Sequence, residues 1–235
     1  MINVFIYAQG KGSRWIEGSH FPVPSEYKQL IPIGDEPLIH RTARQFGWSG
    51  ANNIIVFGKH NVFNGNLPEV YVDIHELNEP TGSIIDGLCS TYMFWGMDGK
   101  SILVLGDVIF DNYVVKQMMD YSGSQVSVFG RMSGNRFTGK MAREIFGLVI
   151  PEDEKKGFHY ILTRAVNHFS VERSYKKLWD LCHYIINYSP LDAYVFQDYT
   201  ESSYTDDVDS PEDWRSYGEK LVNLALEDDK NFVLA

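Results

Sequence analysis

The stretch INVFIYAQGKGSR, residues 2–14, is the strongest indication of the fold class in this sequence. Residues 2–8 are predicted to form a buried strand that runs directly into a glycine-rich loop carrying Lys11 and Arg14. Proteins of the α/β class present backbone N–H groups to phosphate in this way, because glycine lets the main chain approach and the amides carry partial positive charge. The stretch therefore indicates an α/β fold whose first loop binds a nucleotide.

The loop differs from the two better-known phosphate-binding motifs. A Walker A loop places lysine directly after its second glycine, whereas Lys11 lies between Gly10 and Gly12. A dinucleotide fingerprint places a third glycine three residues after the second, where this chain has Trp15. Residues 9–30 show no obvious helix or strand, which is uncommon for a connection of this length unless it has a function. A solvated loop with incidental lysines stays the alternative from this stretch alone.

The length and charge of the chain limit what it can bind. Its 235 residues, 44% of them hydrophobic, suffice for a single α/β domain spanning residues 1–235. The formal net charge of −10 argues against a general nucleic-acid or anionic-membrane surface. A phosphate site in so acidic a chain must therefore be a local cluster of cations.

Cysteine usage and hydropathy predict a soluble, cytoplasmic protein. Cys89 and Cys182 form no CxxC motif and are expected to be buried, reduced thiols. No segment approaches the ~18 consecutive apolar residues of a membrane span, and the N-terminal apolar run lacks the charged region of an export signal. We expect no membrane and no nucleic-acid partner.

Apolar, β-branched runs that alternate with helical patterns predict a mostly parallel sheet with helices on both faces. Apolar stripes at steps of three and four residues mark two helical regions, Ile84–Leu88–Tyr92–Trp95 and Trp214–Tyr217–Leu221–Leu224. The predicted strands after the first lie at residues 53–57, 70–74, 102–105, 125–129 and 145–150.

The sheet is expected to be mixed because of one hairpin. Residues 151–157 form a charged stretch between two apolar runs, residues 145–150 and 158–162. We therefore predict that these two runs are antiparallel strands joined by a turn.

An aspartate stands at the end of a fully apolar predicted strand. Residues 102–105 are followed at once by Gly106 and Asp107. Ligands of open α/β sheets bind beyond the carboxyl ends of the strands, so Asp107 is expected in the crevice that the first loop also faces, with the geometry of a metal ligand. The alternative is an aspartate that only begins a turn or caps the helix near Asp111.

A second acidic group precedes a predicted helix near the end of the chain. Ser210 is the expected N-cap, a proline follows it, and Asp213 lies in the first turn. Asp207 and Asp209 are not needed for this cap. A second carboxylate meeting Asp107 would complete an oxygen site for Mg²⁺, which usually takes one or two carboxylates and leaves its other positions to phosphate and water.

Four short motifs follow one another along the chain. They are Gly10-x-Gly12-Ser13-Arg14, Lys28-x-Leu30-x-Pro32-Ile33-x-x-x-Pro37-Leu38-Ile39, Gly106-Asp107 and Asp209-Ser210-Pro211-Glu212-Asp213. In order and spacing, across nearly the whole chain, they resemble the nucleotidyltransferases that make activated sugars, polyols and choline from nucleoside triphosphates. The chain departs from the family pattern at Gln9, where a second alanine is usual, and at Tyr27, where a proline usually precedes the loop lysine.

The resemblance implies a GT-A-like fold, similar to a Rossmann sheet, and transfer of NMP from an NTP to a small phosphorylated acceptor with release of pyrophosphate. It implies that Arg14 holds the β and γ phosphates, that Lys28 neutralises the α-phosphoryl oxygens, and that Asp107 and Asp209 bind Mg²⁺. Catalysis would then be positioning and electrostatics, without a covalent nucleophile. The implied nucleotide-binding residues are Ala8, Gln9, Gly10, Lys11, Gly12, Ser13 and Gly82, although the segment around Gly82 also fits an ordinary helix start.

The acceptor site is the part that the sequence determines least. Arg136 and Lys140 lie in a basic stretch without acidic residues, which suits either an acceptor phosphate or a solvated loop between strands. Residues 188–203, with many aromatic and hydroxyl side chains, suit an acceptor pocket or a homodimer contact. The expected acceptors are sugar 1-phosphates and alcohol phosphates such as phosphocholine.

CTP is the first nucleotide to expect, because the short chain beyond Asp209 resembles the compact cytidylyltransferases and because Gln9 with main-chain groups suits the cytosine edge. Two other classes of protein remain possible from the sequence. One is a GT-A glycosyltransferase that uses a nucleotide sugar through Asp207-x-Asp209, and the other is a non-catalytic nucleotide-binding module. A loop with Arg14 and Lys28, suited to a triphosphate, argues against the glycosyltransferase.

Overall fold

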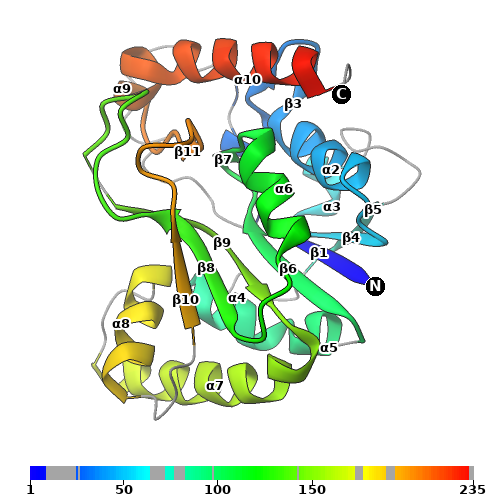
Figure 1. Cartoon of the computed structure of the whole chain (residues 1–235), viewed down its shortest axis with the longest axis vertical. Helices are drawn as coiled ribbons and strands as arrows, with labels where there is room; N and C mark the ends of the chain where they lie inside the picture. The colour runs from blue at the N-terminus through cyan, green and yellow to red at the C-terminus, as the bar shows by residue number, and fades with distance from the viewer. Residues whose placement is uncertain are drawn as a thin grey trace.

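A seven-stranded sheet in the order β10-β8-β9-β6-β1-β4-β5 forms the centre of the protein (Figure 1). The computed structural model describes residues 1–8, 25, 27–63, 72–76, 83–96, 98–141, 143–172, 177–188 and 194–232. All neighbouring strands of the sheet are parallel except β9, which is antiparallel to both β6 and β8. The strands are β1 (Ile2–Tyr7), β4 (Asn53–Phe57), β5 (Val72–His75), β6 (Lys100–Leu105), β8 (Val126–Arg131), β9 (Glu144–Ile150) and β10 (Tyr194–Asp198).

Helices cover both faces of this sheet, as the alternation of strand and helix patterns predicted. Side chains of β1 point alternately to the two faces, so Val4 and Ile6 belong to one apolar cluster and Phe5 and Tyr7 to the other. The first cluster includes α2 (Leu38–Trp48), α3 (His60–Phe63) and α6 (Asn112–Asp120). The second includes α4 (Ile84–Ser90), α5 (Tyr92–Trp95), α7 (Lys155–Glu172) and α8 (Leu178–Tyr188).

The predicted hairpin over residues 145–162 is wrong. Residues 152–154 form the short 3₁₀ helix η2 (Glu152–Glu154), and residues 158–162 belong to α7 rather than to a strand. Phe158, Ile161 and Ala165 are buried at helical spacing, so the apolar run continues a 3.6-residue period that a five-residue window does not reveal. The sheet is nevertheless mixed, because β9 lies between β6 and β8 and runs opposite to both.

A third apolar cluster joins several short elements at one end of the sheet. It includes Ile31, Ile33, Ile109, Val208 and Leu221, all of them buried. Ser210 caps the last helical segment as predicted, since its side chain accepts a hydrogen bond from the Asp213 N–H at 3.1 Å. The elements gathered here are η1 (Lys28–Leu30), β2 (Pro32–Ile33), β3 (Glu36–Pro37), β7 (Val108–Ile109), β11 (Asp206–Asp207), α9 (Pro211–Asp213), the π-helical turn η3 (Trp214–Gly218) and α10 (Glu219–Phe232). None of the described helices is long and apolar enough to cross a membrane.

Arg41 connects α10 to the rest of the described structure through hydrogen bonds. Its side chain is fully buried, and its guanidinium donates to both carboxylate oxygens of Asp229, at 2.9 and 2.7 Å, and to the Phe110 carbonyl at 2.7 Å. The Phe110 carbonyl directly follows β7, so one side chain connects α2, α10 and the segment that leads to α6. A planar guanidinium suits this bidentate contact because its donors are fixed in one plane.

We expect Arg41→Ala to lower the free energy of unfolding by about 3–5 kcal/mol, because the substitution removes a fully buried guanidinium with its charged hydrogen bonds and leaves a cavity, although Arg44 still contacts Asp229 at 2.9 Å. Urea unfolding followed by circular dichroism measures the change. Arg136→Ala is the matched control, since Arg136 is exposed and its pair with Glu201 spans 3.8 Å. A surface pair of this kind contributes about 0–1 kcal/mol. Equal stability of the two variants would contradict the role given to Arg41.

Candidate active site

The candidate site lies at the carboxyl ends of β1 and β6, which are neighbours in the sheet. The register pairs Tyr7 with Leu105, and the Gly106 N–H donates to the Tyr7 carbonyl at 2.9 Å. A Cβ on Gly106 would lie 3.0 Å from the Ala8 Cβ and 3.2 Å from the Tyr7 oxygen, so glycine lets the two chain segments approach closely. Asp107 therefore leaves the sheet directly beside Ala8, the residue that precedes the glycine-rich stretch in the sequence.

Lys28 joins the two aspartates that the sequence predicted as metal ligands. Its Nζ lies 2.7 Å from Asp209 Oδ1 and 3.7 Å from Asp107 Oδ2. The Lys28 side chain is 6% exposed, whereas those of Asp107 and Asp209 are 29% and 23% exposed. The carboxylates are thus open to a ligand while the ammonium between them is largely covered. The structure brings together three of the residues that the sequence singled out.

The pairing of β7 with β11 explains why Asp209 reaches Asp107. These two short strands are antiparallel, with Asp207 opposite Val108. Val108 and Val208 are buried in the apolar clusters, which fixes the backbone on either side of the acidic residues. The segment after β11 is therefore held against the segment after β6, although about a hundred residues separate them in sequence.

Lys140 extends the site to a larger group, which we call the carboxylate cluster. Its Nζ contacts an oxygen of Asp207 and lies 3.7 Å from Asp209 Oδ2 and 3.9 Å from Glu144 Oε2. Asp209 thus lies between two lysines, one from η1 and one from the loop between β8 and β9. The carboxylate cluster comprises Asp107, Glu144, Asp206, Asp207 and Asp209, with the cations Lys28, Arg131 and Lys140.

Arg131 and Asp206 form the most deeply buried ion pair of this cluster. The Arg131 side chain is 1% exposed and its Nη2 donates to Asp206 Oδ1 at 2.6 Å, while Thr138 Oγ1 donates to Asp206 Oδ2 at 2.8 Å. Arg131 ends β8 and is paired in register with Glu144, which begins β9. This arrangement fixes both ends of the loop that carries Lys140.

Opposing effects of burial and charge set the protonation of the cluster. Burial alone would raise the pKa of Asp209, but the charge and hydrogen bond of Lys28 lower it below its usual range. Burial would lower the pKa of Lys28, and Asp107 and Asp209 raise it instead. Burial followed by the Glu144 charge raises the pKa of Asp207 well above its usual value. The pKa values of the two acids of the Asp207-x-Asp209 pair are therefore shifted in opposite directions.

Glu144 behaves differently from Asp209. Burial raises its pKa most, Lys140 opposes this, and the charge of Asp209 raises it again, giving a pKa of about 7. Five carboxylates and three cations leave two formal negative charges uncompensated within the cluster. Raised carboxyl pKa values are the expected response to such an excess.

The donor set of the cluster fits a hard divalent cation. All its candidate ligands are carboxylate oxygens, and Asp107 and Asp209 share one ammonium as a common neighbour. Within the described residues no three His, Cys, Asp or Glu side chains form a complete metal site. The chain would therefore supply two carboxylates and leave the other coordination positions to phosphate and water, as is usual for Mg²⁺.

Of the remaining predicted site residues, the structure describes Arg136 and Ala8. Arg136 is exposed, lies 3.8 Å from Glu201 and packs its guanidinium 4.8 Å from the centre of the Phe137 ring, so it does not join Lys140 in the cluster. Ala8 is buried at the end of β1. The residues Gln9, Gly10, Lys11, Gly12, Ser13, Arg14 and Gly82 lie outside the described residues.

Three residues of the cluster were not among the candidates. Glu144 and Asp206 had no motif around them, and Arg131 was one of several basic residues in its stretch. Asp206 could have been found as the start of the acidic run that ends at Asp209. Nothing local identifies Glu144, because its position depends on the pairing of β9 with β8.

Three solved structures with a similar fold are named as nucleotidyl- or cytidylyltransferases. The inositol-1-phosphate CTP transferase from T. maritima aligns with a TM-score of 0.64 at 14% identity, over 95% of each chain. A protein from Bacillus anthracis described as a glucose-1-phosphate thymidylyltransferase, solved with sucrose, aligns with a TM-score of 0.62 at 14% identity, over 96% of this chain and 95% of that one. The CTP:phosphocholine cytidylyltransferase from Streptococcus pneumoniae aligns with a TM-score of 0.56 at 14% identity, over 94% and 99%.

These similarities concern structure rather than sequence. No protein-family model matches the chain, and no curated protein matches it. The alignments extend over nearly the full length of both chains and confirm the predicted class, a mixed and mostly parallel sheet between layers of helices. The chain has the fold of sugar-phosphate and choline-phosphate nucleotidyltransferases.

Proposed function

We propose that the protein is a Mg²⁺-dependent nucleotidyltransferase that transfers NMP from an NTP to a small phosphorylated acceptor. The observation that supports this most is the largely covered ammonium of Lys28 between the partly exposed carboxylates of Asp107 and Asp209. This group lies at the carboxyl ends of β1 and β6, the edge where open α/β sheets bind ligands. The neighbours of the same fold act, by name, on nucleotides and on phosphorylated sugars, inositol or choline.

The reaction needs positioned charge more than a covalent nucleophile. A phosphate oxygen of the acceptor attacks the α-phosphorus of the NTP, a new P–O bond forms, and the bond to the β-phosphate oxygen breaks to release pyrophosphate. Negative charge accumulates on the α-phosphoryl oxygens in the transition state, so a fixed cation there lowers the barrier. We assign this role to Lys28, because Asp107 and Asp209 hold its Nζ in place.

Asp107 and Asp209 are the residues that we propose hold Mg²⁺. A bound Mg²⁺ would neutralise phosphate charge and orient the two phosphate groups toward each other. The partly exposed, all-carboxylate donor set of Asp107 and Asp209 supports a divalent cation at this position. Asp207 differs from Asp209, because it contacts Lys140 and its side chain is only 7% exposed. We therefore assign Asp207 to the support of Lys140.

The substrate-binding residues follow from the sequence motifs and in part from the cluster. Arg14 is proposed to bind the β and γ phosphates, and residues 8–13 with Gly82 the rest of the nucleotide. Lys140 is proposed to bind the acceptor phosphate, because its ammonium lies beside Asp209. Arg136 stays an acceptor candidate on sequence alone. We further propose that the reaction occurs in the cytoplasm and supplies an activated sugar or alcohol.

A matrix of five NTPs against a panel of phosphorylated acceptors, read by pyrophosphate release with Mg²⁺, tests the function. The panel includes glucose 1-phosphate, inositol 1-phosphate and phosphocholine. We expect release only when one NTP and one acceptor are both present, and each mixture without acceptor is the control. A glycosyltransferase would instead consume a nucleotide sugar, and a nucleotide-sensing module would bind NTP without turnover. Either result, with no pyrophosphate from any mixture, would refute the proposal.

We expect CTP to stabilise the protein more than other nucleotides do. A ligand that binds the native state raises the melting temperature by more the more tightly it binds, so at equal concentration the preferred NTP gives the largest shift. Differential scanning fluorimetry with Mg²⁺ and sub-millimolar CTP, UTP, dTTP, GTP or ATP measures the shifts. A larger shift with dTTP or UTP would contradict the choice of base and favour sugar 1-phosphates as acceptors, with the same mechanism.

A further inference from the structure

The loop between β8 and β9 holds Lys140 by its backbone as well as by its side chain. The Lys140 N–H donates to Thr138 Oγ1 at 3.2 Å. The Lys140 carbonyl accepts from the Asn135 N–H at 2.8 Å and from Arg131 Nη1 at 3.2 Å. A lysine ammonium moves on a flexible four-carbon stem, so the position of the backbone limits where it can reach. The loop therefore determines where the Lys140 ammonium can lie.

Asn135 folds this loop into a closed turn. The residue is 2% exposed, and its Oδ1 accepts from the Phe137 N–H at 2.8 Å. Its backbone carbonyl accepts from the Gly139 N–H at 2.7 Å, and Gly139 has a φ of +77°, which glycine adopts without strain. Its Nδ2 donates to the carbonyls of Tyr204 and Thr205 at 3.5 and 3.4 Å. The turn is thus closed on itself and attached to the segment that leads into β11.

The Thr138 hydroxyl joins the loop to β11. It donates to Asp206 Oδ2 at 2.8 Å while it accepts from the Lys140 N–H. Asp206 is fully buried, and its Oδ1 accepts from Arg131 Nη2 at 2.6 Å and from the Asp207 N–H at 3.0 Å. One hydroxyl therefore connects the backbone of the loop lysine to the buried carboxylate that anchors the acidic segment.

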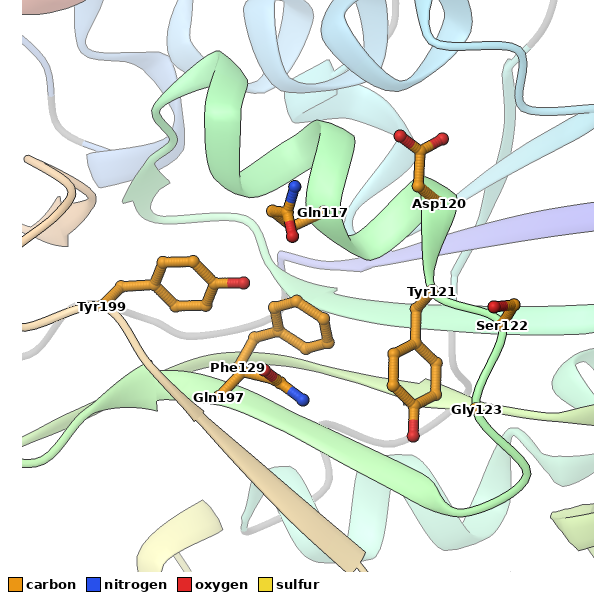
Figure 2. Close-up of a pocket in the computed structure, with 8 residues that line it drawn as sticks. All are labelled: Gln117, Asp120, Tyr121, Ser122, Gly123, Phe129, Gln197 and Tyr199. Carbon is orange, nitrogen blue, oxygen red and sulfur yellow. The ribbon is translucent and has the colours of Figure 1, made fainter.

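The start of the loop is held separately, by the segment after β10. Thr200 Oγ1 accepts from the N–H groups of Met132 and Ser133 at 3.2 and 3.3 Å. The preceding residue, Tyr199, stacks its ring on that of Phe129 with centroids 5.8 Å apart, and both line a depression between α6, β8 and β10 (Figure 2). A change at Thr138 is therefore expected to act on residues 135–140 rather than on the whole loop.

We propose that Thr138 is a positioning residue that holds Lys140 beside Asp209 and thereby sets the affinity for the acceptor phosphate. The inference rests on the proposed function, in which Lys140 binds that phosphate. The Lys140 Nζ contacts Asp207 and lies 3.7 Å from Asp209 Oδ2 and 3.9 Å from Glu144 Oε2, so several acids compete for it. A fixed backbone selects one position among them. The hydroxyl of Thr138 supplies this fixation without contacting a substrate.

Thr138→Val tests this role, because it keeps the size of the side chain and removes its hydroxyl. We expect KM for glucose 1-phosphate, inositol 1-phosphate or phosphocholine, whichever supports turnover, to rise about 5- to 50-fold, with KM for the NTP unchanged within about twofold. Thr138→Ser keeps the hydroxyl and should keep the acceptor KM. Thr163→Val is the matched control, since Thr163 is exposed on α7 outside the carboxylate cluster and donates to the His159 carbonyl at 3.0 Å.

Hydrogen exchange of the full chain, followed by mass spectrometry, measures the loop without catalysis. We expect the amides of residues 135–140 to exchange about 5- to 50-fold faster in Thr138→Val than in the unmodified protein. Thr138→Ser and Thr163→Val should leave these rates unchanged. The amides of β8 and β9 should exchange at the same rate in all four proteins.

Four results would overturn the inference. They are unchanged exchange of residues 135–140 in Thr138→Val, faster exchange throughout the sheet in that variant, an equal rise of KM for the NTP and the acceptor, and failure of Thr138→Ser to keep the acceptor KM. Failure of the proposed function looks different. The unmodified protein would then release no pyrophosphate from any mixture, while Thr138→Val would still accelerate exchange in the loop.

Discussion

Asp209→Asn and Asp107→Asn are each expected to abolish Mg²⁺-dependent turnover and leave the fold intact. Asparagine keeps the size of the side chain but removes the charge that a divalent cation needs from its ligand. Both carboxylates are partly exposed at the edge of the sheet rather than in the core, so the fold does not depend on them. Pyrophosphate release across a Mg²⁺ titration measures turnover, and near-ultraviolet circular dichroism measures the fold.

Two further variants make this test specific. Asp153→Asn is the matched control, since Asp153 is an exposed carboxylate in η2 and should keep full activity. Asp207→Asn distinguishes the two acids of the Asp207-x-Asp209 pair, because Asp207 contacts Lys140 rather than Lys28. We expect Asp207→Asn to weaken acceptor use while Mg²⁺ dependence stays near that of the unmodified protein. Near-normal activity of Asp209→Asn or Asp107→Asn at limiting Mg²⁺ would show that the two-carboxylate site is wrong.

Local patterns predicted the parts of the site that lie at the ends of strands. The apolar run of residues 102–105 ends abruptly at Gly106, and this was enough to place Asp107 at the carboxyl edge beside Ala8. Ser210 was identifiable as an N-cap from its neighbours, which left Asp209 outside the helix and available. In both cases a short-range rule about strand or helix ends fixed the position.

Long-range pairing determined what the sequence could not show. Arg131 and Asp206 are 75 residues apart, and their ion pair exists because β8 ends beside the segment that leads into β11. Lys140 looked like part of a basic loop free of acids, yet Glu144, Asp206 and Asp207 surround it. The sequence therefore predicted a positive patch where the fold builds a mixed cluster.

The error at residues 158–162 has a related cause. A short apolar run fits a buried strand and a buried helix equally well, and only a longer window distinguishes them. Phe169, eleven residues after Phe158, is buried in the same cluster, which a helix of three turns explains and a strand does not. The charged residues 152–156, interpreted as a turn, are the start of that helical segment.

Lys28→Ala is expected to lower the rate of pyrophosphate release by about two to three orders of magnitude, the scale for losing one preorganised contact to a transition state. The Lys28 ammonium is held by Asp107 and Asp209 before any substrate binds, so it needs no rearrangement during the reaction. Removing this cation leaves two carboxylates without their shared partner, and Mg²⁺ should therefore bind as tightly or more tightly. Turnover should thus fall while Mg²⁺ affinity does not fall, which single-turnover rates over a Mg²⁺ titration measure. Lys116→Ala, an exposed lysine of α6, is the control that should keep full activity. Full recovery of Lys28→Ala at high Mg²⁺ would show that Lys28 only organises the metal ligands and does not contact the reacting phosphate.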